Sequence, residues 1–180
     1  MRDRNWLDNI GVPVDPMKLV SLWQPWASAM ALGIKKIETR GWSTSYRGPL
    51  AIYATLTWNA DCRAFSRSDA CWNAFGLLSQ FRAEALRSVL PFGAIIAVCD
   101  LVDCLPTEAC ICVPGVYDDY PDLDIPTERA FGNYDPGRFG FVTENMFRLP
   151  EPIPFKGRQG KLLDVPEEIE AEILRQRRAT

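Results

Sequence analysis

The sequence predicts an α+β fold, a small mixed β-barrel with helices packed on its outside. Short segments with strand character recur along the chain, and helical segments are interspersed between them instead of being gathered at one end. With 180 residues, the chain has room for one domain with elaborations and can bury a substantial core. The elements that support this prediction are taken here in chain order.

The first part of the chain supplies three predicted strands and one short helix. Residues 17–22 (MKLVSL) and 35–40 are expected to be strands, and so is 49–54 (PLAIYA), which is buried because its run is apolar. Pro25 suits the first turn of a helix, so PWASAMAL is predicted to be a short helix that ends at Gly33.

The middle of the chain alternates between helical and strand character. Residues 58–90 lack strand alternation and predict one or two helices with a break near Gly76. The run GAIIAVCDLVDC at 93–104 predicts a long buried strand, and strands resume at 138–149 and around 160–164. At the end of the chain, Asp164 is expected to cap a final helix that Pro166 opens.

Charge is distributed unevenly along the chain, although the net charge is only −3. Residues 17–48 hold five cations against one acid (+4), and 136–161 hold five cations against two acids (+3). Between them, 100–135 hold nine acids against one arginine (−8). Because 105–137 are also rich in proline, aspartate and glycine, we expect an acidic surface loop there instead of a core element.

Composition excludes several classes of protein. Hydrophobic residues make up 47% and charged residues 24%, which is typical of globular proteins. No apolar run approaches the roughly 20 residues of a membrane helix, so we expect a cytoplasmic location. The six cysteines are expected to be free thiols. With no histidine and no C-x2-C pair, neither a zinc site nor a cofactor is predicted, and any catalysis must use lysine, carboxylate, tyrosine or thiol groups.

The stretch GIKKIETRGW at 33–42 is the strongest candidate for a binding site. Glu38 and Arg40 lie two residues apart, so in a strand their side chains share one face. There the acid could orient the arginine toward phosphate or base atoms, or the two could form a salt bridge with no ligand. Strict alternation excludes Lys35 from that face, so we expect the strand to begin after Lys35 and leave it on a bend.

Three tryptophans, Trp23, Trp26 and Trp42, surround this stretch. Bases of single strands stack on aromatic faces, but tryptophans of a small barrel are usually core residues, and about two of the three are expected there. Trp26, on a helix with small alanines, is the expected cleft wall. Gln24 could read a base edge or cap the helix.

Several motifs in this order resemble the ASCH (activating signal cointegrator 1 homology) domain family of bacteria and phages. Its G-x-K-x-x-E-x-R pattern appears as Gly33, Lys35, Glu38 and Arg40, preceded by QPWA and followed by a Tyr46-Arg47-Gly48 turn. GAIIAVCDLVDC resembles the central strand of the family, and PGRFGFVTENMFRLPEPIPFKGRQG resembles its closing hairpin. The resemblance covers about residues 17–165.

This resemblance implies a PUA-like barrel with a cleft beside the first helix and the motif strand. It implies the following division: an N-terminal arm at 1–16, an ASCH domain at 17–165 with a helical insertion at about 58–90 and an acidic loop at about 105–137, and a C-terminal helix at 166–180. Relatives handle RNA, modified nucleobases or DNA, and one small branch hydrolyses N4-acylated cytidines with a threonine, a lysine and a glutamate.

Tyr53 departs from the common pattern of the family, and so do residues 159–162 (QGKL), where many members have Q-G-L-W. Glu38 matches the family pattern and departs only from that of the small hydrolytic branch. Tyr53 stands where many members have histidine, and its ring is expected in the core with its hydroxyl reaching the pocket. Glu38 occupies the slot of the nucleophilic threonine, so Lys35 and Glu38 are candidate catalytic residues only if the protein is an enzyme. The expected binding residues are Gln24, Trp26, Lys35, Glu38, Arg40, Tyr53 and Lys156.

Three functions follow as alternatives. The leading one is a module that binds RNA, another single-stranded nucleic acid or a modified nucleoside. The second is a hydrolase of the N4-acylcytidine type or another nucleic-acid hydrolase. The third is a protein-interaction or regulatory module that uses the acidic residues 105–137, because a run of carboxylates can imitate phosphates.

Overall fold

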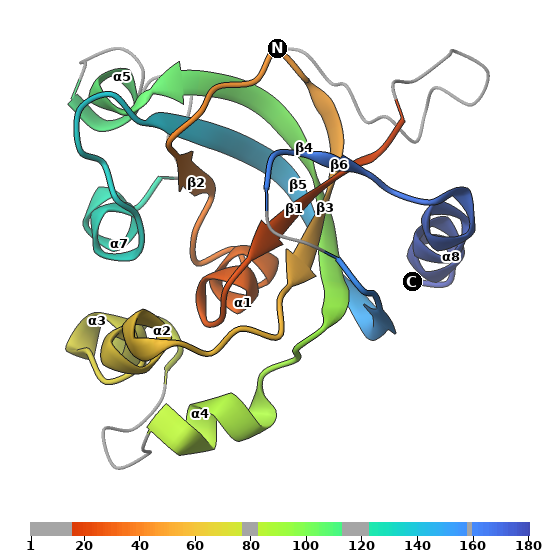
Figure 1. The fold of residues 1–180 in the computed structure, drawn as a ribbon, viewed down its shortest axis with the longest axis horizontal. Helices are drawn as coiled ribbons and strands as arrows, with labels where there is room; N and C mark the ends of the chain where they lie inside the picture. The colour runs from red at the N-terminus through yellow and green to blue at the C-terminus, as the bar shows by residue number, and fades with distance from the viewer. Residues whose placement is uncertain (1–15, 77–82, 113–122, 158–159) are drawn as a thin grey trace.

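The computed structural model describes residues 16–76, 83–112, 123–157 and 160–180, and its centre is a curled six-stranded sheet, a half-barrel (Figure 1). The strands are β1 (Lys18–Leu22), β2 (Ile37–Arg40), β3 (Gly48–Ala54), β4 (Ala94–Pro106), β5 (Phe139–Pro154) and β6 (Leu163–Asp164). Their order in the sheet is β2-β5-β4-β3-β1-β6. β1 runs parallel to β3, and the other neighbouring strands pair antiparallel. The predicted α+β class, a curled mixed sheet with flanking helices, is therefore confirmed, and the predicted barrel takes the form of a half-barrel.

The sheet curls because its two longest strands are interrupted by bulges. The pairing of β4 with β5 shifts register between Ile95 and Ala97, between Val98 and Asp100, and between Leu101 and Asp103. The first shift adds three residues to β5, the second adds one residue to β5 and the third adds one residue to β4. Such irregularities increase the local bend and twist of the strand. The curl creates a concave face, on which helix α1 (Trp26–Ala31) lies.

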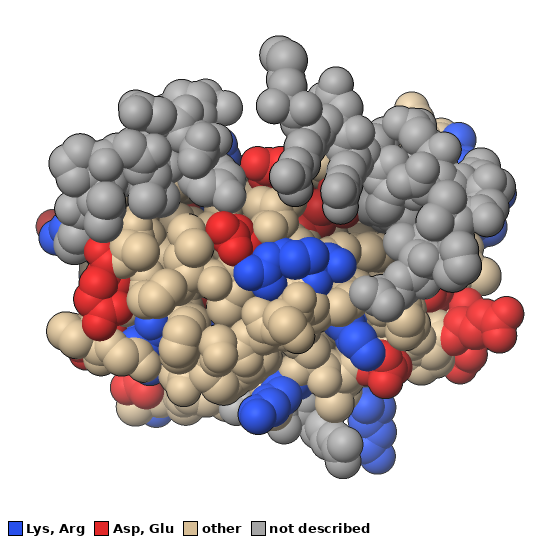
Figure 2. Space-filling view, turned by 90° about the horizontal axis from the view of Figure 1, so that it is seen from above, with Lys and Arg blue, Asp and Glu red and all other residues tan. Residues whose placement is uncertain are grey.

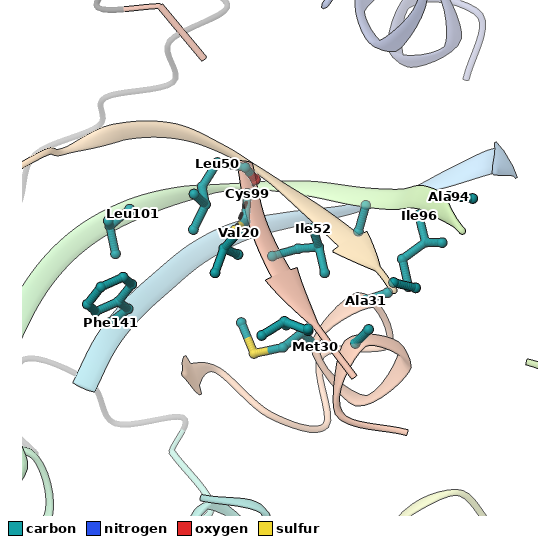
Figure 3. Close-up of a cluster of buried hydrophobic side chains, with 14 residues drawn as sticks. Val20, Met30, Ala31, Leu50, Ile52, Ala94, Ile96, Cys99, Leu101 and Phe141 are labelled. Carbon is teal, nitrogen blue, oxygen red and sulfur yellow. Dashed lines mark hydrogen bonds between the residues drawn. The ribbon is translucent and has the colours of Figure 1, made fainter. Parts of the chain in front are cut away.

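The core on the concave face joins α1 to the central strands. Met30 of α1 points toward Val20 of β1 and Ile52 of β3 (Figure 3). The alanines of α1 are small enough to let the helix approach the sheet closely. As predicted, Gly33 terminates the helix: α1 ends at Ala31, and Gly33, two residues later, has a φ of 70° and donates its N–H to Met30 O.

The opposite face of the sheet is covered by helix α8 (Glu167–Arg178). Ile173 of α8 is buried there with Met17 and Leu19. The predicted helix is confirmed, but the predicted cap is wrong. Asp164 ends β6, where its carboxylate pairs with Lys18, and Pro166 occupies the N-cap.

Residues 58–90 form more helices than predicted: α2 (Ala60–Phe65), α3 (Asp69–Ala74) and α4 (Ala83–Val89). The reason is that polar caps restart the helix. Asn59 Oδ1 accepts from Cys62 N at the start of α2, and Ser68 Oγ accepts from Cys71 N at the start of α3. The break predicted near Gly76 is confirmed, because α3 ends at Ala74 and Gly76 has a φ of 62°.

The expectation of a surface loop at 105–137 is wrong for the part that the structure describes. This part contains α5 (Thr107–Cys112) and α7 (Ile125–Phe131), and both Glu128 and Phe131 of α7 are buried. Five of the nine acids of the segment 100–135 bond within the protein: Asp100 with Asn145, Asp103 with Arg47, Glu108 with Gly137, Asp124 with Thr127 and Glu128 with Ile37. Residues 113–122 lie outside the described residues.

Two further features concern the state of the cysteines and the lengths of the helices. The cysteines whose side chains the structure describes, Cys62, Cys71, Cys99, Cys104 and Cys110, are free thiols. Among the described residues, no helix is long and apolar enough to cross a membrane.

Candidate functional site

A cavity of about 570 Å³ opens beside α1, at the end of β1. Its walls come from the turn after β1, from α1, β2, α2 and α7, and from the chain that follows α7. Its aromatic lining residues are Trp23, Trp26 and Phe131, and its charged ones are Glu38, Arg40, Asp61 and Arg138. The size falls within the usual range of small-molecule sites.

The motif strand β2 places Glu38 and Arg40 on the cavity wall. Arg40 Nε lies 3.2 Å from Glu38 Oε1, and Arg40 Nη2 donates to Ser21 O at 2.7 Å. The two side chains share one face, as alternation in a strand predicts. The arginine is therefore held in place from two sides, by a carboxylate and by a backbone carbonyl of β1.

Lys35 does not line the cavity, although the sequence predicts it as a ligand contact. The strand begins at Ile37, so Lys35 does lie on a bend. However, its side chain is 1% exposed, and its ammonium group donates to Ile37 O and lies 3.5 Å from Glu38 Oε2. The turn after α1 directs the Lys35 side chain into the protein. There its positive charge neutralises Glu38 on the side of the carboxylate away from Arg40.

Glu128 of α7 is a buried acid that sequence reasoning did not select. Its Oε1 accepts from Lys36 N at 2.5 Å, and its Oε2 accepts from Ile37 N at 3.3 Å and from the hydroxyl of Tyr134 at 3.2 Å. Burial raises the pKa of the Glu128 carboxyl, against the opposing effects of the Lys35 charge and of these hydrogen bonds. The carboxylate thereby fastens α7 to the start of β2.

The chain after α7 is fastened to the other end of β2. Thr39 Oγ1 accepts from Asn133 N at 3.1 Å, and Arg138 donates from Nη2 to Thr39 O at 3.3 Å and from Nε to Asn133 O at 3.1 Å. Gly132 is required in this connection, because an added Cβ would lie 2.5 Å from Tyr134 and 3.2 Å from Thr39. Residues 130–133 thus form a fixed wall opposite α1.

Aromatic rings from several helices pack in a row along the cavity. The ring centroids of Trp26 and Phe65 lie 4.8 Å apart at an interplanar angle of 21°, and Phe65 meets Phe131 edge to face at 4.8 Å. Trp42 instead packs edge to face on the core residue Phe141. Trp23, which was expected among the core residues, lines the cavity beside Trp26.

Besides Lys35, three further predicted binding residues lie outside the cavity lining. Gln24 is 0% exposed, its Oε1 accepts from Ser28 N at 3.1 Å and its Nε2 donates to Pro91 O at 2.7 Å, so its amide stabilises the start of α1. Tyr53 packs on Phe155 at 5.6 Å in the core on the α8 side of the sheet. Lys156 is exposed and follows Phe155 at the end of β5.

Cations and acids are paired or interspersed elsewhere on the surface. Lys18 pairs with Asp164, and Arg47 Nη2 lies 2.8 Å from Asp103 Oδ1. On the face drawn in Figure 2, basic and acidic side chains are mixed among uncharged ones. Lys18 and Arg47 of the first positive segment are therefore partly neutralised by acids.

Several residues that line the cavity were not selected from the sequence, and only one of them had a signal there. Arg138 belongs to the second basic segment and could have been selected for that reason. Asp61 and Phe131 lie far from the motif in sequence and reach the cavity only because α2 and α7 pack around it. No cluster of three or more His, Cys, Asp or Glu side chains that could hold a metal ion occurs in the described ranges.

Comparisons with known proteins identify relatives of the chain. It is 27% identical over 138 residues to mouse and to human activating signal cointegrator 1. The alignment covers 77% of this chain but only 20% of the length of those relatives.

A solved structure, the ASCH protein of Zymomonas mobilis, matches with a TM-score of 0.50 at 14% identity, covering 89% of this chain and 94% of that one. This likeness shows that the two proteins share a fold. The model of the family described as "ASCH domain" matches residues 20–120. The chain therefore belongs to the ASCH domain family.

Proposed function

We propose that the protein is a nucleic-acid-binding module whose cavity receives an unpaired nucleotide of single-stranded RNA. The ASCH family is PUA-like and associated with RNA binding. The domain that would carry this function spans residues 17–165, and helix α2, from the region 58–90, and helix α7 contribute to the walls of its cavity.

The observation that carries the proposal is the combination of aromatic rings and anchored arginines around one cavity. Trp23, Trp26 and Phe131 offer surfaces on which a base can stack. Arg40 and Arg138 are held by backbone carbonyl oxygens, so their guanidinium groups are oriented before a ligand arrives. A base among the rings with its phosphate near an arginine uses both features.

The geometry does not favour the hydrolase alternative. Lys35, the candidate activating group, is buried behind Glu38 and lies outside the cavity lining. Glu38 offers no hydroxyl for attack, and its two oxygens face Lys35 and Arg40. Thr39 also lines the cavity, but its hydroxyl oxygen already accepts a hydrogen bond from Asn133 N.

The acidic protein-partner alternative has little support from the described residues. Five acids of the segment 100–135 bond inside the protein, and Glu128 is buried among them. Carboxylates engaged in this way do not form an exposed run that resembles phosphates.

The experiment is a binding titration with a labelled single-stranded RNA of about ten nucleotides, followed by fluorescence anisotropy. We expect Arg138→Gln to weaken binding about tenfold, because one charge-assisted contact is lost. Arg148→Gln is the matched control, since Arg148 is an exposed arginine of β5 that does not line the cavity. No binding by the unaltered protein, or equal affinities for both variants, would contradict the proposal.

A further inference from the structure

The charges on the cavity wall balance. Arg40 and Arg138 contribute two positive charges, and Glu38 and Asp61 contribute two negative ones. Lys35, which would have made the site positive, is turned into the protein. A neutral cavity does not attract several phosphates, so its polar groups are better suited to the edge of a base than to a run of backbone.

The four charged side chains differ in how many hydrogen bonds and ion pairs they already make within the protein. Glu38 is shared between Lys35 and Arg40, and Arg138 donates to Thr39 O and Asn133 O. The carboxylate of Asp61, by contrast, is exposed and makes no hydrogen bond or ion pair with any residue in the described part of the chain. It is therefore the carboxylate of the cavity that can accept a hydrogen bond from a ligand.

Helix α2 holds Asp61 next to the stacking surface. Asp61 and Phe65 are four residues apart and so lie on the same side of α2. Phe65 packs face to face on Trp26, which orients this side of the helix toward α1. The cap from Asn59 to Cys62 N fixes where α2 begins. A base that stacks in the cavity consequently meets a carboxylate at its edge.

We propose that Asp61 is a specificity determinant, and that the cavity selects a base with an exocyclic amino group over uracil. This inference rests on the proposed function. A carboxylate only accepts hydrogen bonds, so it pairs with the amino group of cytosine, adenine or guanine. Uracil has a carbonyl oxygen where cytosine has its amino group. That oxygen is also an acceptor, so the carboxylate and uracil repel each other.

The test compares an oligouridine of about ten nucleotides with the same strand carrying one central cytosine or adenine. We expect the substituted strands to bind about tenfold more tightly, as one hydrogen bond to a charged group implies. Asp61→Ala should abolish this ratio, whereas Asp61→Asn, which keeps an acceptor oxygen, should retain part of it. The quantity compared between variants is the ratio of the affinities for the substituted strand and for oligouridine. Removing the negative charge of Asp61 strengthens the binding of every strand alike and therefore cancels in this ratio.

The matched control is Asp69→Ala, which removes an exposed carboxylate of α3 that does not line the cavity, and it should keep the full ratio. A ratio near one in the unaltered protein, or a full ratio in Asp61→Ala, overturns the assignment of Asp61 while leaving nucleic-acid binding intact. Failure of the unaltered protein to bind any strand overturns the proposed function as well.

Discussion

The buried ammonium group of Lys35 lies 3.5 Å from the Oε2 atom of Glu38, on the side of the carboxylate away from Arg40. The charged residues of the motif thus form a chain of cation, anion and cation in which Lys35 has a structural position. Breaking a buried ion pair by removing one partner is strongly destabilising, because the other charge is left without compensation.

Lys35→Met should therefore lower the free energy of unfolding by about 3 kcal/mol, measured by urea denaturation. Methionine keeps the length of the side chain but removes the charge that faces Glu38. Lys161→Met, at an exposed position, should change stability by less than about 0.5 kcal/mol. If Lys35→Met keeps its stability and loses only RNA binding, Lys35 is a ligand contact after all.

Trp26→Ala should weaken RNA binding by about 1–3 kcal/mol, the range for loss of one base stacked on an aromatic ring. Its fold stability should fall by only about 1 kcal/mol, because the half-buried Trp26 ring loses its packing on Phe65. Trp58→Ala, which removes a ring packed on Phe92 away from the cavity, serves as the control for binding. Unchanged affinity in folded Trp26→Ala excludes Trp26 from the interface.

Glu128→Gln should be destabilising, and more so in acid. An amide has one acceptor oxygen where the carboxylate uses two, so a buried N–H of β2 loses its partner, at a cost of about 1–3 kcal/mol. Because burial raises the folded-state pKa of Glu128, its contribution to stability is greatest below the unfolded pKa and is lost as the pH rises through the folded pKa.

The difference in unfolding free energy between the unaltered protein and Glu128→Gln should therefore grow as the pH falls from about 7 to about 4, toward the ordinary pKa of glutamate. Urea denaturation at several pH values measures it. Glu144→Gln, an exposed substitution on β5, is the control and should show no such trend. A difference that shrinks in acid would mean that the hydrogen bonds outweigh burial at Glu128.

The salt dependence of RNA binding should be shallow. Two cavity arginines reaching phosphates give a slope of about −1.4 in a plot of log affinity against log salt concentration. The positive segments of the sequence taken alone suggest three or four contacts and a slope of about −2 to −3. Pairing of Lys18, Lys35 and Arg47 with acids explains the lower value. Anisotropy titrations at several salt concentrations measure the slope, and a value steeper than about −3 would place the interface elsewhere.

Incubation with N4-acetylcytidine should yield no acetyl adduct on the protein and at most weak release of cytidine. A carboxylate nucleophile would form a high-energy mixed anhydride, and Glu38 is held between two cations. Chromatography of the nucleoside and mass measurement of the protein check this. Rapid turnover that Glu38→Gln abolishes would reveal a water-activating role for Glu38.

The sequence predicts those parts of the protein that local pattern controls. Apolar runs locate β3 and β4, and the turn at Gly33 and the start of β2 after Lys35 follow from backbone preference and alternation. Side-chain direction at a bend depends on what packs around it, so the burial of Lys35 could not be read from spacing. Glu128 and Asp61 reach the site through tertiary packing of α7 and α2, which local pattern does not encode.

Photocrosslinking shows directly whether RNA enters the cavity lined by Trp23, Trp26 and Phe131. A single-stranded RNA carrying one photoreactive cytosine, which keeps the amino group that Asp61 is proposed to bind, is irradiated with the protein, and the linked peptides are mapped by mass spectrometry. We expect crosslinks to these aromatic residues. The crosslinks should be lost in Trp26→Ala and kept in Trp58→Ala. Crosslinks confined to peptides outside the cavity, such as those of α8 or Lys156, would contradict the proposed function.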